Sequence, residues 1–272
     1  MKAQAILILM SLFSFVAAWA QAPAKAAEGT VKGSFTMNGK TVPLTHVYAL
    51  VRPDPFEEKK DVVAVYLTDA PVDEDTLRDE FGLFEPARDG KLHAIEVRID
   101  VGTKEVTGGQ LYHKDIESGS MSVSGMNQLD LKQFTAKQIS GHLTAGPEES
   151  FDNKWEYSAD FSAPVWPKPV ETAAALDSPP AQVALAFVKA AQAKDKAGLK
   201  KVIAPEMAAQ LDGPEGAQLM AMLPQMFPPS LKLTKVVMQG ANKAIITFKA
   251  PKEHDTTTVK AALVNGEWRI SK

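Results

Sequence analysis

The sequence predicts an α+β protein of two domains: an antiparallel β-sandwich or β-barrel, followed by a domain in which three helices pack on an antiparallel sheet. Residues 28–163 contain many short stretches of alternating apolar and polar residues, separated by turn residues. Residues 178–272 begin with apolar residues at helical spacing and end with strand-like segments. Between them, residues 164–177 contain three prolines within six positions, which favours an extended linker.

The first hairpin of the N-terminal domain has the clearest local signal. Thr30 to Met37 is a predicted strand, and Asn38-Gly39 follows it. Both of these residues tolerate the positive φ angles of a type I′ turn. Lys40 to Val51 is predicted to return as one strand. Further strands are predicted at 61–67, 92–99, 105–113, 119–126, 137–144 and 154–163, and a short helix capped by Asp73 is predicted to run through Phe81.

The C-terminal domain is predicted to start with helices and to finish with strands. Ser178 is a suitable N-cap before Pro179-Pro180, and the apolar stripe continues to about Ala193. Asp195 can cap a second helix in the same way. The third predicted helix is 218–227, and the predicted strands are 231–238, 243–250, 256–264 and 267–272, the last two joined by a type I′ turn at Asn265-Gly266.

Two segments of this domain resemble the nuclear-transport-factor-like superfamily, which includes the polyketide-cyclase-like proteins. They are Phe187 to Asp195, where a helix ends in an acidic turn, and Ala262 to Ile270, where a hairpin reads Asn-Gly-x-Trp-x-Ile. The resemblance implies a cone-shaped α+β fold with three helices on a curved antiparallel sheet. It implies that a pocket lies inside the cone. Residues 28–163 resemble no family in this way.

The first twenty residues have the pattern of a signal peptide. Lys2 precedes an apolar core from Ile6 to Val16, and small residues lead to a predicted cleavage site between Ala20 and Gln21. The apolar run is too short for a retained transmembrane anchor. The chain has no cysteine, so disulfides and a lipid-modified cysteine are excluded. We therefore expect a periplasmic or secreted protein whose residues 21–27 are disordered.

Composition and motifs exclude several classes of function. The formal net charge is −3 and no long Lys/Arg cluster occurs, which argues against nucleic-acid binding. The five histidines form no pair at metal-ligand spacing, and the acidic residues between Asp69 and Glu80 lack the pattern of a calcium loop. No nucleophile elbow or phosphate-binding loop is present. The sequence predicts no catalytic residue, no metal site and no cofactor.

The favoured hypothesis is a non-enzymatic binding protein of the bacterial envelope. Its partner would be a small apolar molecule or an envelope protein. The second domain holds five of the ten methionines, and methionine adapts to irregular ligands. The predicted wall of the pocket consists of Phe187, Met222, Met226, Phe248 and Trp268.

Three alternatives remain open at this point. A cyclase-like or isomerase-like enzyme would use His254 and Asp255, an adjacent pair predicted to lie in a hairpin turn. A passive structural or assembly module would bind no ligand. A glycan-binding β-domain would stack sugars on exposed aromatic residues, for which the candidates are Tyr48, Tyr66, Trp155 and Tyr157.

Overall fold

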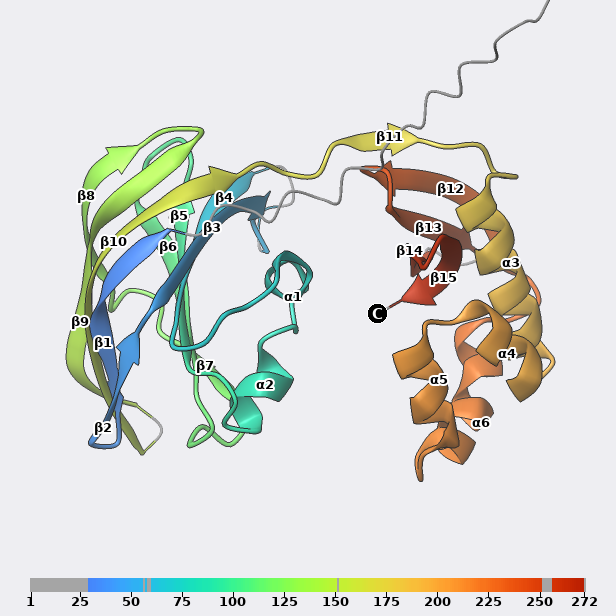
Figure 1. The fold of residues 1–272 in the computed structure, drawn as a ribbon, viewed down its shortest axis with the longest axis horizontal. Coiled ribbons are helices and arrows are strands. Elements are labelled where there is room, and N and C mark those ends of the chain that lie inside the picture. Colours follow the sequence, from blue (N-terminus) through green and yellow to red (C-terminus); the bar gives the residue numbers. More distant parts are fainter. Residues whose placement is uncertain (1–28, 56, 58–59, 151, 251–255, 272) are drawn as a thin grey trace, which may run out of the picture. The chain divides into compact units, whose positions relative to one another are not determined.

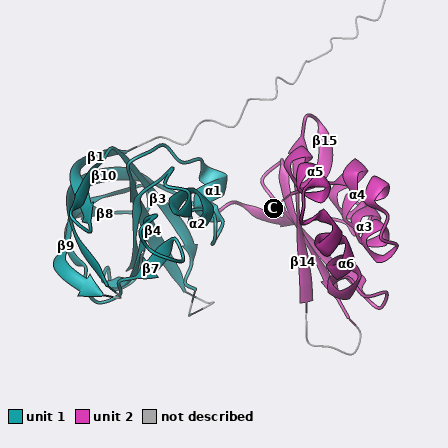
Figure 2. Cartoon of the chain, turned by 90° about the horizontal axis from the view of Figure 1, so that it is seen from below, with its two compact units in different colours: residues 1–167 teal, residues 168–272 magenta. Residues whose placement is uncertain are grey.

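A computed structural model describes residues 29–55, 57, 60–150, 152–250 and 256–271. The chain divides into two compact units, Met1–Pro167 (unit 1) and Lys168–Lys272 (unit 2), shown in different colours in Figure 2. The division falls within the stretch that we predicted to be a linker. Apolar side chains form separate buried clusters in the two units. Among the described residues, no helix is long and apolar enough to cross a bilayer.

Unit 1 is built on one ten-stranded sheet (Figure 1). The strand order is β2-β1-β10-β3-β4-β5-β6-β7, and β9, followed by β8, pairs along the opposite edge of the long strand β10 from β1. All pairs are antiparallel except β10 with β3, where Val165 lies opposite Ala49. The strands are β1 (Thr30–Met37), β2 (Lys40–Leu44), β3 (His46–Pro53), β4 (Asp61–Thr68), β5 (Ala94–Asp100), β6 (Val106–Tyr112), β7 (Ser120–Ser122), β8 (Gln128–Phe134), β9 (Gln138–Ser150) and β10 (Asn153–Trp166).

The first hairpin forms as predicted, but its return strand does not. Asn38 and Gly39 have φ angles of 51° and 77°, which confirms the turn. The predicted strand from Lys40 to Val51 is wrong, because it is split at Thr45 into β2 and β3. The backbone N–H of Thr45 donates to Thr68 O at 2.9 Å, and its hydroxyl donates to Asp69 O. Thr45 thus marks the point where the chain leaves β1 and joins β4.

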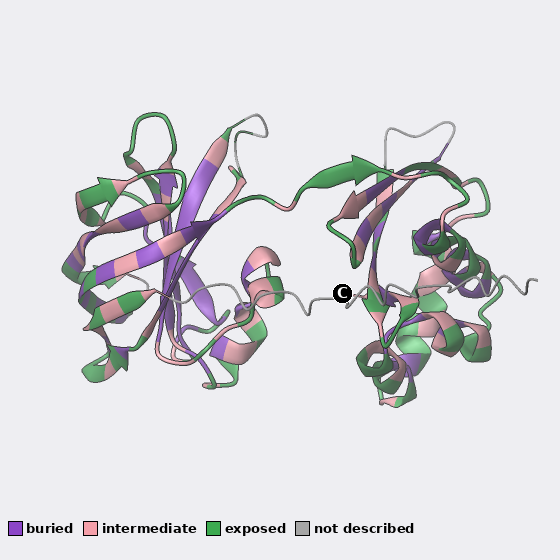
Figure 3. Ribbon diagram, turned by 45° about the horizontal axis from the view of Figure 1, so that its top comes forward, coloured by how far each residue is buried: buried purple, intermediate pink, exposed green. Residues whose placement is uncertain are grey.

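Side chains of β1 and β10 share one core with side chains of β3 to β6. Along β10, Trp155, Tyr157, Ala159 and Phe161 are buried while the residues between them are exposed, as the alternating colours in Figure 3 show. This is the period of two that a strand requires when one face is buried. Buried residues of β3, β4, β5 and β6 belong to the same cluster.

The other face of β3 to β6 is covered by two short helices. Apolar residues of α1 (Glu74–Arg78) and α2 (Phe84–Arg88) pack with Tyr48, Tyr66 and Tyr112 in a second cluster. Asp73 caps α1 as predicted, accepting a hydrogen bond from Thr76 N at 2.9 Å. The helix ends at Arg78 rather than at Phe81, and α2 was not predicted.

Unit 2 has a five-stranded antiparallel sheet in the order β11-β12-β13-β14-β15 (Figure 1). Its turn at Asn265 and Gly266 has the positive φ angles expected, 52° and 83°. The helix start at Pro179 is also confirmed, although Ser178 makes no side-chain capping bond. The elements are β11 (Glu171–Ala173), α3 (Pro179–Gln192), α4 (Lys196–Val202), α5 (Pro205–Asp212), α6 (Gly216–Met226), β12 (Lys232–Gln239), β13 (Lys243–Lys249), β14 (Thr256–Val264) and β15 (Glu267–Ser271).

The predicted fold class is wrong. Strands hold 48% and helices 21% of the described residues, so the chain is mostly β. The expected all-antiparallel sandwich or barrel is a mixed sheet, because β10 continues through Pro164 to Val165 and Trp166, which are buried against β3. Burial of these two apolar side chains outweighs the donor lost at the proline.

The cone-shaped domain with three helices is not shown either. Four helices lie within the described part of unit 2, since Pro205 starts α5 as a separate helix. The predicted linker also supplies strand β11, in which Thr172 lies opposite Met238. Side-chain periodicity could not reveal this edge strand, because all three of its residues are exposed.

Candidate functional site

Of the five residues predicted to line a pocket, the structure brings Phe187, Phe248 and Trp268 to one core cluster and leaves Met222 and Met226 outside it. Phe187 and Phe248 are buried in the core of unit 2, where Phe187 packs edge-on against Phe227. Met222 and Met226 lie on the surface of α6 and are 46% and 54% exposed. Trp268 is half-buried and lines a hollow.

The hollow at Trp268 lies among α3, α4 and β15 and has a volume of about 390 Å³. Two of its charged side chains pair with each other: Arg269 donates to the carboxylate of Glu267, and it also donates to the backbone oxygen of Lys201. These contacts leave a mixed, partly neutralised lining. The residues around it are Pro179, Gln182, Val183, Ala186, Lys201, Val202, Glu267, Trp268 and Arg269.

Helix α6 presents an exposed apolar surface, which we call the α6 face: Leu219, Met222 and Met226. Leu219 is 37% exposed, and the two methionines are exposed further. Residues at positions i, i+3 and i+7 lie on one side of a helix. The segment from Gly216 to Leu231 contains no charged residue. The α6 face is therefore apolar and uncharged along its whole length.

The opposite side of α6 holds the helix on the core. Met220 and Leu223 are half-buried and pack against the core of unit 2. At the start of the helix Gly216 is buried, and a Cβ there would lie 2.0 Å from Leu211 O. At its end, Phe227 is buried against Phe187. These contacts fix which side of α6 faces outward.

A cluster of charged and phenolic side chains lies in unit 1 on the sheet face that carries α1 and α2. Tyr112 Oη donates to Glu96 Oε2 at 2.9 Å, and Arg52 Nη1 donates to Tyr66 Oη at 2.7 Å. Glu96 also lies 3.9 Å from Arg52 Nη1 and 3.6 Å from Arg98 Nε. The Arg98 guanidinium lies over Gly108, where a Cβ would contact it.

Burial governs the protonation of this cluster. It raises the pKa of Tyr66 and of Tyr112, and the nearby Glu96 carboxylate raises both further. Both phenols therefore stay protonated, and Tyr112 acts as a donor to Glu96. Sequence reasoning missed the cluster, because Glu96 and Arg98 alternate with apolar residues along a predicted strand. That pattern ordinarily indicates that the charged face of the strand is in water.

A second polar cluster joins His93, Asp69 and His113. Asp69 Oδ2 lies 2.6 Å from His93 Nδ1, and Asp69 Oδ1 accepts the backbone N–H of His93. The His113 ring lies 4.4 Å from the His93 ring, and its Nδ1 accepts a hydrogen bond from Asp115 N. Burial, together with the neighbouring His93, lowers the pKa of His113 to about 4, so the His113 ring is neutral at neutral pH.

Other sequence-based candidates have different outcomes. Tyr48, Tyr66, Trp155 and Tyr157 are each at most 5% exposed, so the hypothesis that they stack on sugars is wrong. The predicted cleavage site and the His254-Asp255 pair lie outside the described residues. Within the described ranges, no three histidine, aspartate or glutamate residues are placed to hold a metal ion.

Comparison with known proteins adds little. No protein-family model matches the chain, and no curated protein matches it. The crystal structure of Burkholderia cenocepacia BcnA is similar to part of the chain, with 15% sequence identity, 48% of this chain and 94% of that chain covered, and a TM-score of 0.24. Such a TM-score is too low to indicate a shared fold. The resemblance of unit 2 to the nuclear-transport-factor-like superfamily remains a prediction.

Proposed function

We propose that this chain is a non-enzymatic binding protein of the bacterial envelope, exported by its first twenty residues, and that it binds a protein partner through the α6 face. The observation that carries the proposal is the exposure of Leu219, Met222 and Met226 on one side of α6. Scattered exposed apolar residues are ordinary on protein surfaces. Three large apolar side chains exposed on one uncharged helix face instead form a patch, and such patches commonly mark an interaction site.

The shape of this face favours a protein over a small molecule. A small ligand is normally enclosed in a concave site. The α6 face is instead the outer side of a helix whose inner side packs on the core. Apolar anchors at positions i, i+3 and i+7 are the pattern with which a helix enters the apolar groove of a partner protein. Methionine suits this role because its side chain adapts to the partner surface.

A site-specific photo-crosslinker at Met222 tests the surface. Leu185 on α3 is 44% exposed and serves as the control position. In envelope fractions, we expect an adduct from position 222 that position 185 does not give. The purified partner should bind the native chain, lose affinity by about tenfold or more when Leu219, Met222 and Met226 are changed to serine, and retain binding at high salt.

Other results would contradict the proposal. Equal adducts from both positions would mean that the α6 face is not selective. An adduct with a second copy would indicate self-association, and binding of the chain to lipid vesicles would indicate a membrane surface instead. The export part is tested separately by N-terminal sequencing of protein from the periplasmic fraction. We expect the mature chain to begin at Gln21, and an intact leader on a cytoplasmic protein would contradict export.

A further inference from the structure

The hollow at Trp268 in unit 2 has a preformed apolar floor. Val183, Val202 and Trp268 line it, are half-buried and pack against the core. The lining residues of α3 lie at positions i, i+3, i+4 and i+7 from Pro179, which places them on one side of the helix. The volume of about 390 Å³ is that of a site for a small molecule.

The indole of Trp268 points to the core side of the sheet and stays accessible there. Trp268 shares one face of β15 with Ile270, which is 2% exposed in the core of unit 2. Its cross-strand neighbour Leu263 is 41% exposed, so the core does not close over this end of the β14–β15 hairpin. Trp268 therefore presents part of a flat aromatic ring to the hollow.

The charged side chains around this floor leave one cation in excess. Glu267 and Arg269 pair with each other and contribute no net charge. Lys201 is exposed, and its ammonium group forms no ion pair or hydrogen bond with any described residue. No other charged residue lines the hollow, so its net charge is positive. That charge favours an anionic group on the ligand.

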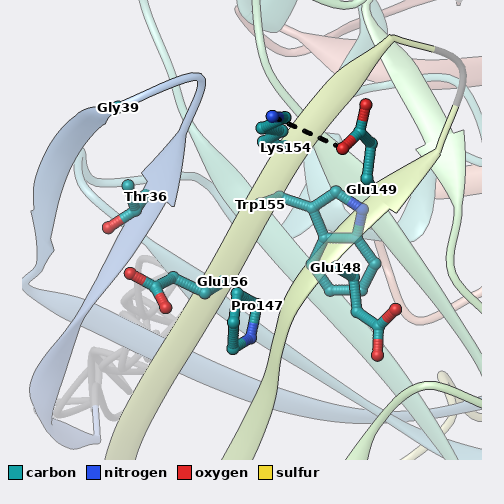
Figure 4. Close-up of a pocket in the computed structure, with 8 residues that line it drawn as sticks. All are labelled: Thr36, Gly39, Pro147, Glu148, Glu149, Lys154, Trp155 and Glu156. Carbon is teal, nitrogen blue, oxygen red and sulfur yellow. Dashed lines mark ion pairs between the residues drawn. The ribbon is translucent and has the colours of Figure 1, made fainter.

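The hollow of unit 1 shown in Figure 4 lacks this arrangement. Its indole belongs to Trp155, which is 2% exposed and lies in the core. Strand alternation points this side chain to the opposite face of β10 from Glu156. The charged groups of that hollow therefore have no open aromatic surface beside them, whereas Lys201 lies beside one.

We infer that the hollow at Trp268 binds a small organic carboxylate with a flat apolar body, such as an aryl-substituted propanoate. The apolar body lies against Trp268, Val183 and Val202, and the carboxylate accepts a hydrogen bond from the ammonium group of Lys201. Burial of the apolar body supplies most of the free energy of binding, because an exposed ion pair contributes little. This site does not depend on the α6 face or on the protein partner proposed for it.

Three probes separate the apolar part of the ligand from its charge. The first, 3-phenylpropanoate, carries both; 3-phenylpropanamide keeps the ring without the charge, and propanoate keeps the charge without the ring. Titrations are followed by ¹H–¹⁵N NMR of the mature chain, and Trp268→Phe assigns the Trp268 indole resonance. We expect 3-phenylpropanoate to shift this resonance together with the amides of residues 182–186 and 201–202. The amide probe should bind about threefold to fivefold more weakly, and propanoate should leave the indole resonance unchanged.

Two variants test the charge and the space separately. Lys201→Gln should weaken binding of 3-phenylpropanoate by about threefold to fivefold and leave binding of the amide probe unchanged. The control is Lys200→Gln, because Lys200 lies outside the hollow and pairs with Asp212. Ala186 is an exposed lining residue, so Ala186→Leu should fill the hollow and abolish binding of both ring-bearing probes without disturbing the core.

Several results would overturn the inference. An indole resonance of Trp268 that does not respond to 3-phenylpropanoate would mean that the ring is closed to ligands. Equal binding of the acid and the amide, or equal weakening by Lys201→Gln and Lys200→Gln, would mean that Lys201 does not select an anion. Unchanged binding to the Ala186→Leu variant would place the probe outside the hollow.

Discussion

The two units depart from ordinary burial in opposite directions. Unit 1 places polar, titratable groups inside, with Glu96 at 5% and His113 at 2% exposure. Unit 2 places large apolar groups outside, on the α6 face. The buried groups of unit 1 find their partners within the unit, through Tyr112, Arg52 and Asp115. The described residues of unit 2 leave the side chains of the α6 face largely exposed, so the comparison separates polar groups that serve stability from apolar groups that can serve binding.

The largest effect on stability is expected from a change at the buried carboxylate of Glu96. Glu96→Gln removes the negative charge that lies 3.9 Å from Arg52 and 3.6 Å from Arg98, and it changes the acceptor of Tyr112. Breaking a buried ion pair from one side typically costs about 3–5 kcal/mol. We expect the free energy of unfolding of unit 1 to fall by this order. Urea unfolding in a Trp268→Phe background measures it, because Trp155 and Trp166 then report on unit 1.

The control for this measurement is Glu117→Gln at an exposed position, which should change stability by less than about 0.5 kcal/mol. If Glu96→Gln behaved like the control, the buried charges would be neither paired nor important for stability. The contrast between the units would then disappear.

A smaller effect on the free energy of unfolding is expected from a change in pH. The folded state holds the pKa of His113 at about 4, below its ordinary value of 6.5. Between pH 6.5 and pH 4 the unfolded chain binds a proton at His113 that the folded chain does not. The free energy of unfolding therefore has its full value, as far as His113 is concerned, above pH 6.5, and it falls as the pH falls toward 4. We expect a loss on the order of 2 kcal/mol over this range. Urea unfolding at successive pH values measures it, and His113→Gln should remove this part of the slope.

Local chemistry predicted the parts of the fold that depend on neighbouring residues. The turns at Asn38-Gly39 and Asn265-Gly266 and the cap at Asp73 follow from side-chain and backbone preferences within four residues. The parallel pairing of β10 with β3 joins residues more than a hundred positions apart. Periodicity carries no information about such a pairing, so the fold class was wrong.

The candidate sites were hidden for the same reason. Asp69 and His93 are 24 residues apart, and Glu96 and Tyr112 are 16 apart. For α6 the difficulty is different. Met220 and Leu223 on the inner side are as apolar as Met222 and Met226 on the outer side, so the sequence shows no polar face. Without one, spacing could not indicate which methionines face the core.

The smallest expected change in stability, that of a variant on the α6 face, provides the sharpest test of whether this face is free of the core. Met222 and Leu223 are adjacent, but Met222 is 46% exposed while Leu223 packs against the core. Leu223→Ala should lower the free energy of unfolding of unit 2 by about 1–2 kcal/mol, since a half-buried side chain loses part of its apolar contact area. Met222→Ala should change it by less than about 0.5 kcal/mol. Thermal or urea unfolding measures both. A large loss from Met222→Ala would mean that this side chain stabilises the fold, and the α6 face would no longer be free for a partner.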